Sequence, residues 1–140
     1  MSKRVFLGGT CNDSTWRNGM MVYLHNLGLE YFNPVVDDWD DGAQAKEFYE
    51  REHCDFCLYA ITPKMLGVYS IAEVVDDSNK RPNKTVLVLL RTDGADKFTE
   101  AQWKSLEMVA RMVKRNGGLV FNNLHAAAVE MANINSGDEE

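Results

Sequence analysis

Apolar positions along the chain follow two patterns in turn, and these predict alternating strands and helices. Short runs that are apolar at almost every position are typical of strands buried on both faces of a sheet. Between these runs, apolar residues recur every three or four positions, which predicts helices with one buried face. The predicted strands cover residues 4–8, 30–32, 55–61, 85–90 and 119–121, and the predicted helices cover residues 16–27, 43–53, 70–79, 99–116 and 123–131.

Strands that alternate with helices predict a parallel sheet with helices on both faces, which is a three-layer α/β domain. Five strands in a chain of 140 residues fit the flavodoxin-like strand order 2-1-3-4-5. The C-terminal ends of the strands then form the edge at which ligands bind. We expect a single domain over residues 1–134 and a disordered acidic tail over residues 135–140.

Composition and charge limit the classes of partner. Hydrophobic residues make up 45% of the chain and charged residues 26%, which is ordinary for a globular protein. The formal net charge of −6 argues against nucleic acid, whose binders normally carry a basic stripe. No apolar run approaches the roughly 18 residues of a membrane span, and the N-terminus lacks the apolar core of a signal peptide. We therefore expect a cytoplasmic protein with no membrane or nucleic-acid partner.

The three cysteines, Cys11, Cys54 and Cys57, are expected to be free thiols in that compartment. Cys54 and Cys57 form a C-x-x-C pair, but the pair lies at the start of a predicted strand and not at the helix N-terminus that lowers a thiol pKa. Strand alternation would place the two sulfurs on opposite faces. We therefore favour buried small residues over a redox or metal-binding role.

The loop after the first strand, residues 8–14, lies at the edge where ligands bind. Its spacing matches neither the dinucleotide-binding motif nor the P-loop, but Gly9 permits close approach of the backbone to a ligand. Thr10 and Asn12 are able to donate hydrogen bonds to a phosphate or a sugar hydroxyl. A tight turn without a ligand explains the same residues equally well.

Two charged residues on the neighbouring helices are further candidates. Arg17 follows Trp16, which we expect in the core, and can point back at the first loop as a partner for an anion or a carboxylate. Glu47 can face the same strand ends from its helix, although a surface position beside Lys46 is the commoner outcome for a glutamate. The three histidines are scattered and have no adjacent nucleophile, which argues against Ser-His-Asp and Cys-His chemistry.

Glu73 follows the third strand at the same edge of the sheet. Residues 62–73 open the next helix, and we expect Glu73 in its first turn, where the helix dipole stabilises a carboxylate by about 0.3–1 kcal/mol. An ionised carboxylate at this edge is a candidate nucleophile. The segment Ser70-Ile71-Ala72-Glu73 also matches a capping box, in which the glutamate bonds back to the Ser70 backbone. Caps are much commoner than active sites, so both interpretations stay open.

A cluster of aspartates, Asp37, Asp38, Asp40 and Asp41, surrounds Trp39 after the second strand. A run of like charges is usually a solvated loop. Alternatively, Trp39 stacks on a planar base while Asp38 or Asp40 accepts hydrogen bonds from the base or the sugar. The spacing of the aspartates does not match an EF-hand calcium loop.

In their order and spacing, these motifs resemble those of the nucleoside 2-deoxyribosyltransferase-like family over most of residues 4–130. The motifs are Val5-Phe6-Leu7-Gly8-Gly9-Thr10, Trp16-Arg17, Phe32-Asn33-Pro34 with Asp38-Trp39-Asp40, Cys54-Asp55 before a buried strand, and Ser70-Ile71-Ala72-Glu73. The resemblance implies a flavodoxin-like fold and an enzyme that acts on the N-glycosidic bond of 2′-deoxynucleosides or their 5′-monophosphates.

The resemblance also implies roles for individual residues. Glu73 would attack C1′ and form a covalent glutamyl-deoxyribosyl intermediate, by the logic of retaining glycosidases. Glu47 would protonate the leaving base, and Thr10 would contact the sugar or the 5′-phosphate. A second base, in a transferase, or water, in an N-glycosidase, would then take the sugar, and neither route needs a metal or an organic cofactor.

Family members commonly share active sites across a homodimer or a higher homo-oligomer, and Asn122 or Asn123, after the last strand, is the residue that a partner subunit would supply. The substrate-binding residues that we expect are Gly9, Thr10, Asn12, Arg17, Asp38, Trp39, Asp40, Ser70 and Asn123.

The approach to Glu73 differs from that of the family's transferases, in which glycines and an additional aspartate precede the glutamate. Here Tyr69-Ser70-Ile71-Ala72 takes the place of the glycines, and residues 62–72 contain no aspartate. Hydrolysis therefore stays open beside transfer, and so does a non-catalytic nucleotide-binding module that kept the fold. A flavin-binding flavodoxin is a weaker alternative, because the first loop lacks the run of Ser and Thr hydroxyls that would hold a flavin phosphate.

Overall fold

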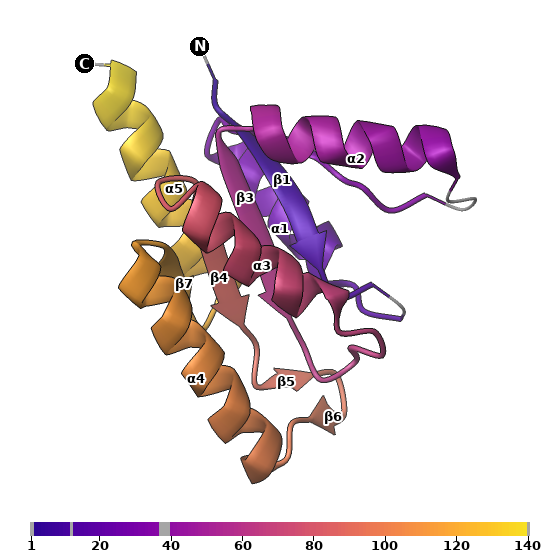
Figure 1. Ribbon diagram of the computed structural model, residues 1–140. Coiled ribbons are helices and arrows are strands. Elements are labelled where there is room, and N and C mark those ends of the chain that lie inside the picture. Colours follow the sequence, from indigo (N-terminus) through magenta and orange to yellow (C-terminus); the bar gives the residue numbers. More distant parts are fainter. Residues whose placement is uncertain (1, 12, 37–39, 140) are drawn as a thin grey trace.

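The computed structural model describes residues 2–11, 13–36 and 40–139, with side chains described as far as residue 134. At its centre is a five-stranded parallel sheet with the strand order β2-β1-β3-β4-β7 (Figure 1). The strands are β1 Arg4–Gly9, β2 Glu30–Phe32, β3 Phe56–Ile61, β4 Thr85–Leu89 and β7 Leu119–Phe121. β7 is the fifth strand of this sheet along the chain, so the predicted order 2-1-3-4-5 is confirmed.

Helices cover both faces of the sheet, as the alternating pattern predicts. The helices are α1 Trp16–Asn26, α2 Asp41–His53, α3 Tyr69–Lys80, α4 Glu100–Asn116 and α5 Leu124–Glu139. In Figure 1, α3 and α4 lie in front of the sheet, while α1 and α5 lie behind it. None of the helices in the described part of the chain combines the length and the apolar character that crossing a bilayer requires.

Side-chain alternation along the strands divides the core into two clusters, one on each face of the sheet. Val5 and Leu7 pack with the apolar side chains of α1 and α5, whereas Phe6, between them in sequence, packs with those of α3 and α4. Every residue of β3 and β4 is buried, because both strands are covered on both faces. The three-layer α/β prediction is therefore confirmed.

Two parts of the chain differ from the predicted elements. A two-stranded antiparallel sheet, β5 Thr92–Asp93 with β6 Asp96–Lys97, lies between β4 and α4. It is too short and too polar to leave an apolar pattern. Helix α5 continues to Glu139, so the predicted end of the last helix at residue 131 is wrong, and the backbone of the expected tail is helical as far as Glu139. Ala132 and Ile134 in this extension pack against the core, but the residues from 135 to 139 are polar or small and leave no apolar pattern that predicts the rest of the helix.

The two cysteines of the C-x-x-C pair lie in the same core cluster. The prediction of opposite faces is wrong because Cys54 is the C-cap of α2 and precedes β3, so strand alternation does not reach it. Cys54 donates to Oε2 of Glu50 at 3.3 Å, and Cys57 donates to the main-chain oxygen of Arg51 at 3.1 Å. Burial raises the pKa of both thiols to about 12, as expected for inert, buried small residues.

Candidate active site

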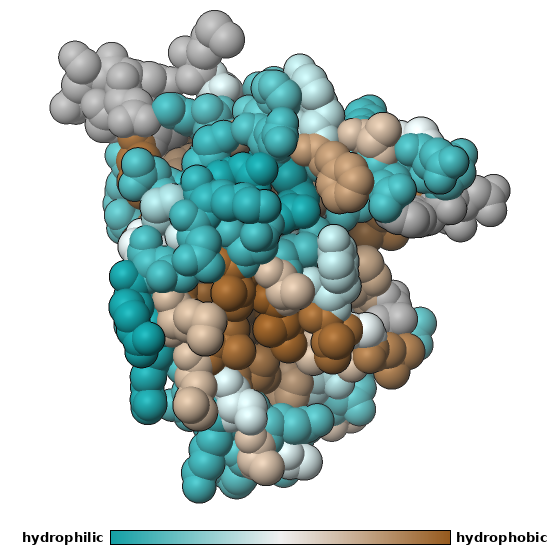
Figure 2. All heavy atoms as spheres, viewed as in Figure 1, coloured by the Kyte–Doolittle hydropathy of each residue, from teal (hydrophilic) through white to brown (hydrophobic). Residues whose placement is uncertain are grey.

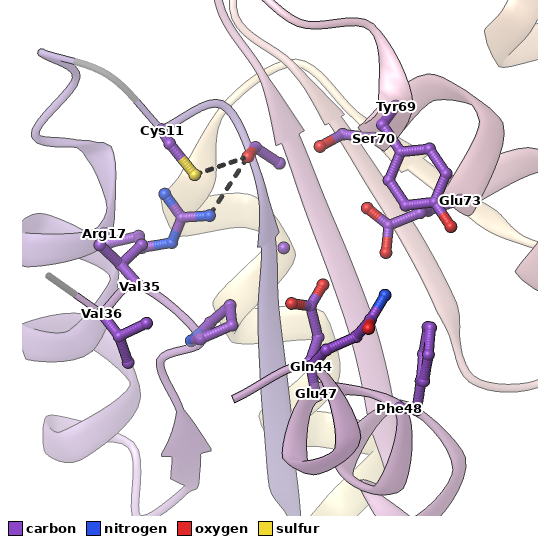
Figure 3. A pocket seen from close by; sticks show the side chains of 13 residues that line it. Cys11, Arg17, Val35, Val36, Gln44, Glu47, Phe48, Tyr69, Ser70 and Glu73 are labelled. Atoms are coloured by element: carbon purple, nitrogen blue, oxygen red, sulfur yellow. Dashed lines mark hydrogen bonds between the residues drawn. The ribbon is translucent and has the colours of Figure 1, made fainter. Parts of the chain in front are cut away.

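A cavity of about 610 Å³ opens at the C-terminal end of β1 (Figure 3). The first loop, the segment after β2, helix α2 and the start of α3 form its wall. The volume lies within the roughly 300–1,000 Å³ that is typical of small-molecule sites. Its position is the edge at which parallel α/β sheets bind ligands.

Glu73 enters this cavity from α3. The helix begins at Tyr69, with Val68 as N-cap and no side-chain cap, so Glu73 lies in the second turn. The predicted first-turn position is therefore wrong, and so is the alternative of a capping box, because Ser70 lies inside the helix and not at its N-cap. The Glu73 side chain points toward the cavity beside Ser70 and Tyr69 (Figure 3).

Burial, and not the helix dipole, dominates the electrostatics of Glu73. The residue is 7% exposed, and burial raises the pKa of its carboxyl group to about 7. Arg51 acts in the opposite direction, since its Nη1 lies 3.5 Å from Oε2 of Glu73 and favours the ionised form. The negative charges of Glu47 and Asp77 raise the pKa further. At neutral pH the carboxyl group is consequently divided between its protonated and ionised forms.

Glu47 faces the same cavity from α2, opposite Glu73 (Figure 3). The structure therefore brings together the two carboxylates that the sequence analysis singled out, one on each wall. Glu47 is half-buried and lines the cavity, and its role there as an acid stays a prediction. Among the described residues, no three His, Cys, Asp or Glu side chains come close enough to hold a metal ion.

Arg17 is buried and ties the first loop to the end of β1. Its Nε donates to the main-chain oxygen of Leu7 at 3.0 Å, Nη1 to that of Thr10 at 2.6 Å and Nη2 to that of Gly9 at 3.2 Å. The guanidinium thus points back at the first loop, as predicted, but its partners in the structure are main-chain carbonyls and not a carboxylate. Burial lowers the pKa of Arg17 from its usual value. Arg17 still lines the cavity, as does Gly9.

The first loop approaches β3 closely. Gly9 has a φ of +112°, and a Cβ at this position would lie 2.1 Å from the main-chain oxygen of Ala60. The Thr10 hydroxyl accepts a hydrogen bond from the main-chain N–H of Thr62 at 2.9 Å, which joins the loop to the end of β3. Thr10 does not line the main cavity but a smaller hollow of about 210 Å³, which shares Gly9, Tyr69 and Ser70 with the main cavity.

Two other expected site residues lie outside the wall of the main cavity. Asp40 is the N-cap of α2 and accepts the main-chain N–H of Ala43 at 2.8 Å. Asn123 accepts the main-chain N–H of Ala126 at 2.8 Å and so caps the first turn of α5. Asn12, Asp37, Asp38 and Trp39 lie outside the described residues. A role for Asn123 at the site of a partner subunit stays a prediction.

Sequence reasoning missed the apolar wall of the cavity. Val35, Val36, Phe48 and Tyr69 line it, and all four are large hydrophobic residues with at least 47% of their surface exposed. The sequence does contain signals for this wall: Val35 and Val36 follow the second strand at its C-terminal end, and the aromatic residue Phe48 follows Glu47. Large exposed apolar side chains gathered around a cavity favour a ligand with a flat or apolar part.

An α/β domain with two facing carboxylates at its ligand edge is typical of enzymes that use paired acids. The chain belongs to the family described as nucleoside 2-deoxyribosyltransferase like, which matches residues 2–93. The matched region extends from β1 to β5 and includes both Glu47 and Glu73. No curated protein matches the chain.

Proposed function

We propose that the protein cleaves or transfers the N-glycosidic bond of a 2′-deoxynucleoside or a 2′-deoxynucleoside 5′-monophosphate. The observation that carries this proposal is the pair Glu73 and Glu47, which face one cavity of about 610 Å³ from two different helices. Membership of the family supports a nucleoside or nucleotide substrate. The cavity has the size for a nucleoside, and its apolar wall suits a planar base.

In the first step, an ionised Glu73 oxygen attacks C1′ while the bond from C1′ to the base nitrogen breaks. The base nitrogen takes the electron pair of that bond and a proton from Glu47, and the sugar remains as an ester on Glu73. In the second step, water or the nitrogen of another base attacks C1′, its proton passes to Glu47, and Glu73 leaves as a carboxylate. This is the double displacement of retaining glycosidases, in which one carboxyl group changes from acid to base.

The remaining residues bind the substrate in this proposal. Arg17 and Gly9 shape the loop against which the sugar lies, and Thr10 and Ser70 contact the sugar or a 5′-phosphate. Asn12, Asp38, Trp39 and Asp40 contribute contacts to the sugar and the base. The two carboxyl groups perform the acid, base and nucleophile roles, so the reaction requires no metal or organic cofactor.

We also propose that the protein works as a homodimer or a higher homo-oligomer, in which Asn123 of one subunit approaches the site of the next. Figure 2 shows hydrophobic side chains gathered over α3, the segment before it and α4. The large exposed apolar residues on these elements are Leu66, Val68, Tyr69, Met108 and Met112. Apolar surface of this kind is typical of a face covered in an assembly. Light scattering coupled to size exclusion measures the subunit number directly.

Release of free base tests the proposed function. The protein is incubated with deoxynucleosides and deoxynucleoside monophosphates, and with their ribose counterparts, while chromatography detects free or exchanged base. Glu73→Gln is expected to lose activity by at least a hundredfold, since a carboxamide cannot form the ester. Glu52→Gln, an exposed position on α2, is the matched control and should retain activity. Activity of Glu73→Gln within a few-fold of wild type would exclude the covalent mechanism.

The same assay tests the rival, a non-catalytic nucleotide-binding module. The residues Tyr69 to Ala72 before Glu73, which differ from the glycines of the family's transferases, favour this rival. Calorimetric binding of a deoxynucleotide without any release of base would support it.

A further inference from the structure

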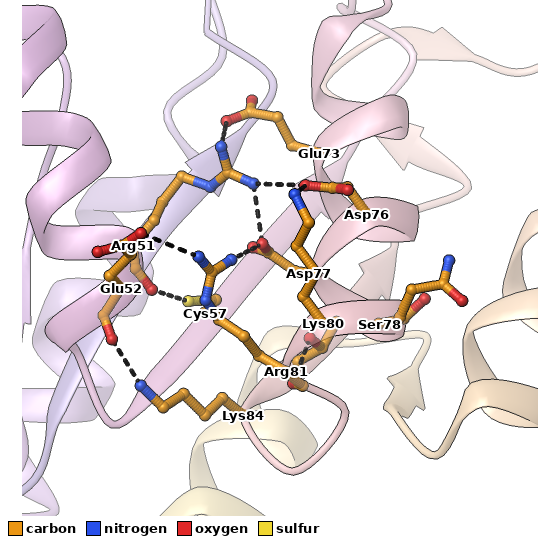
Figure 4. A network of polar contacts seen from close by, with 12 residues as sticks. Arg51, Glu52, Cys57, Glu73, Asp76, Asp77, Ser78, Lys80, Arg81 and Lys84 are labelled. Atoms are coloured by element: carbon orange, nitrogen blue, oxygen red, sulfur yellow. Dashed lines mark hydrogen bonds and ion pairs between the residues drawn. The ribbon is translucent and has the colours of Figure 1, made fainter.

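Arg51 reaches from α2 to the carboxylates of α3 (Figure 4). Its Nη1 lies 3.5 Å from Oε2 of Glu73, its Nη2 donates to Oδ1 of Asp77 at 2.8 Å, and the same Nη2 lies 3.8 Å from Oδ2 of Asp76. Arg51 is 8% exposed, Glu73 is 7% exposed and Asp77 has no exposed surface, so the contacts of Arg51 with Glu73 and Asp77 form with little water present, whereas Asp76 is half exposed. Charge pairs interact more strongly in such surroundings than at the surface.

Asp77 anchors this arginine. The aspartate has no exposed surface, and its Oδ1 also accepts from Nη1 of Arg81. Its Oδ2 accepts the hydroxyl of Tyr59 at 2.5 Å. Burial, together with the negative charge of Asp77, raises the pKa of Tyr59, so this hydroxyl stays protonated and acts as a donor. Three donors from β3, α2 and the end of α3 thus fix one carboxylate.

The network leaves one donor of Arg51 without a hydrogen-bond partner. Nε of Arg51 is buried without a hydrogen-bond partner among the described residues, although a structural arginine is normally saturated. The side chain is oriented so that one Nη faces Asp77 and the other faces Glu73. An unpaired buried donor costs free energy. The side-chain orientation that leaves Nε of Arg51 unpaired is the same one that places Nη1 beside the Glu73 carboxylate.

We propose that Arg51 is a positioning residue that holds Glu73 oriented and ionised for attack, and that Asp77 and Tyr59 hold Arg51 in place. This inference rests on the proposed function, in which Glu73 is the nucleophile. The contact engages Oε2, so Oε1 is the oxygen that we assign to the attack on C1′. The charged groups that act on Glu73 are Arg51 and Glu47 from α2 and Asp77 from its own helix, and Arg51 is the cation among them.

The ionisation of Glu73 is the readout that tests this inference. The carboxyl carbons of glutamate are labelled with ¹³C, and the Glu73 signal is assigned by its absence in Glu73→Gln. An opposite charge within about 4–6 Å lowers a carboxyl pKa by about 1–3 units, so Arg51→Gln should raise the midpoint of Glu73 by about one pH unit or more. From a pKa of about 7, a one-unit rise lowers the ionised fraction at pH 7 about fivefold. Base release at pH 7 should fall by at least that factor.

Three further variants separate positioning from support of the fold. Arg51→Lys keeps the positive charge and should return the midpoint toward the wild-type value. Tyr59→Phe removes only a hydroxyl that contacts neither Glu73 nor the cavity, and it should raise the midpoint by a smaller amount because Arg51 shifts toward the freed oxygen of Asp77. Arg91→Gln removes one arginine charge from an exposed pair with Glu100 and should leave the midpoint unchanged.

The possible results are distinct. An unchanged Glu73 midpoint in folded Arg51→Gln overturns the inference, and an unchanged midpoint in Tyr59→Phe overturns the part assigned to Tyr59 and Asp77. If Arg51→Gln does not fold, Tyr59→Phe decides in its place, since an unchanged Glu73 midpoint in this variant then overturns the inference. If the wild type releases no base from any substrate, the proposed function fails, while the titration still decides whether Arg51 controls Glu73.

Discussion

Arg17 and Arg51 are both buried beside the cavity, but they use their donors differently. Arg17 donates to three main-chain carbonyls, whereas Arg51 contacts carboxylates. Burial lowers the pKa of Arg17. Burial acts on Arg51 in the same direction but is outweighed, because the carboxylates of Asp77 and Glu73 raise its pKa. The acceptor, and not the degree of burial, decides what a buried arginine does: Arg17 shapes a loop, and Arg51 sets the charge of a side chain.

The largest effect is expected when the anchor of Arg51 is removed. Asp77→Asn leaves a buried guanidinium without its closest carboxylate, and the free energy of unfolding should fall by about 3–5 kcal/mol. Urea denaturation followed by circular dichroism measures this loss. Asp76→Asn on the same helix is the control, since Asp76 is half exposed and should cost less than about 1 kcal/mol. Similar losses in the two variants would contradict the role of Asp77 as anchor.

The next effect concerns the pH dependence of stability. The pKa of Glu73 is about 7 in the folded protein, against an ordinary value of 4.5, so the folded state binds this proton more tightly than the unfolded state. The resulting stability is fully present below about pH 4.5 and is lost as the pH rises to about 7, by up to about 3 kcal/mol. Glu73→Gln should lack this part of the slope in urea titrations from about pH 4 to pH 8. Parallel stability curves for the two proteins would show that Glu73 titrates normally.

A smaller effect is expected when the other arginine is replaced. Arg17→Met removes the donors to Leu7, Gly9 and Thr10, and the free energy of unfolding should fall by about 2 kcal/mol. In contrast to Arg51→Gln, this variant should leave the Glu73 midpoint unchanged in the ¹³C titration. A shifted midpoint would mean that Arg17 also controls charge, and the comparison between the two arginines would not hold.

The smallest effect is expected at an exposed arginine. Arg91 pairs with Glu100 at 2.5 Å, but both side chains are at least half exposed. Arg91→Gln should change the free energy of unfolding by less than about 1 kcal/mol, because solvent screens such a pair. A loss of stability as large as that of Arg17→Met would show that burial does not decide how much an arginine contributes to the free energy of unfolding.

Local patterns in the sequence predicted most of the architecture. The alternation at Val5, Phe6 and Leu7 corresponds to the two core clusters, and the apolar run at residues 85–90 corresponds to a strand covered on both faces. A capping box is present at residues 99–102, where the Thr99 hydroxyl accepts from the main-chain N–H of Gln102 and the Gln102 side chain accepts from the main-chain N–H of Thr99. These features depend on residues a few positions apart, and such residues are neighbours whatever the rest of the chain does.

The same kind of pattern misled at Ser70 and Cys54. A capping box needs Ser70 at the N-cap, but the N-cap of α3 is Val68, two residues earlier, and Glu73 is left to face the cavity. Cys54 ends a helix, so the alternation of the strand that follows does not apply to it. In both cases the motif was correct in composition, and the element boundary, which is set by packing, decided its meaning.

The sequence by itself determined the alternation of strands and helices and the two faces of the sheet, because each segment carries its own period of burial. The strand order and the ligand edge followed from the flavodoxin-like arrangement that five such strands fit. Only the tertiary structure decided the chemistry of that edge. Arg51 and Asp77 are 26 positions apart and meet because the Arg51 side chain reaches from the C-terminal part of α2 to α3. The pKa of Glu73 is raised by burial in the fold and lowered by Arg51 from another helix. Residue spacing within one segment of the sequence cannot predict a contact between two helices.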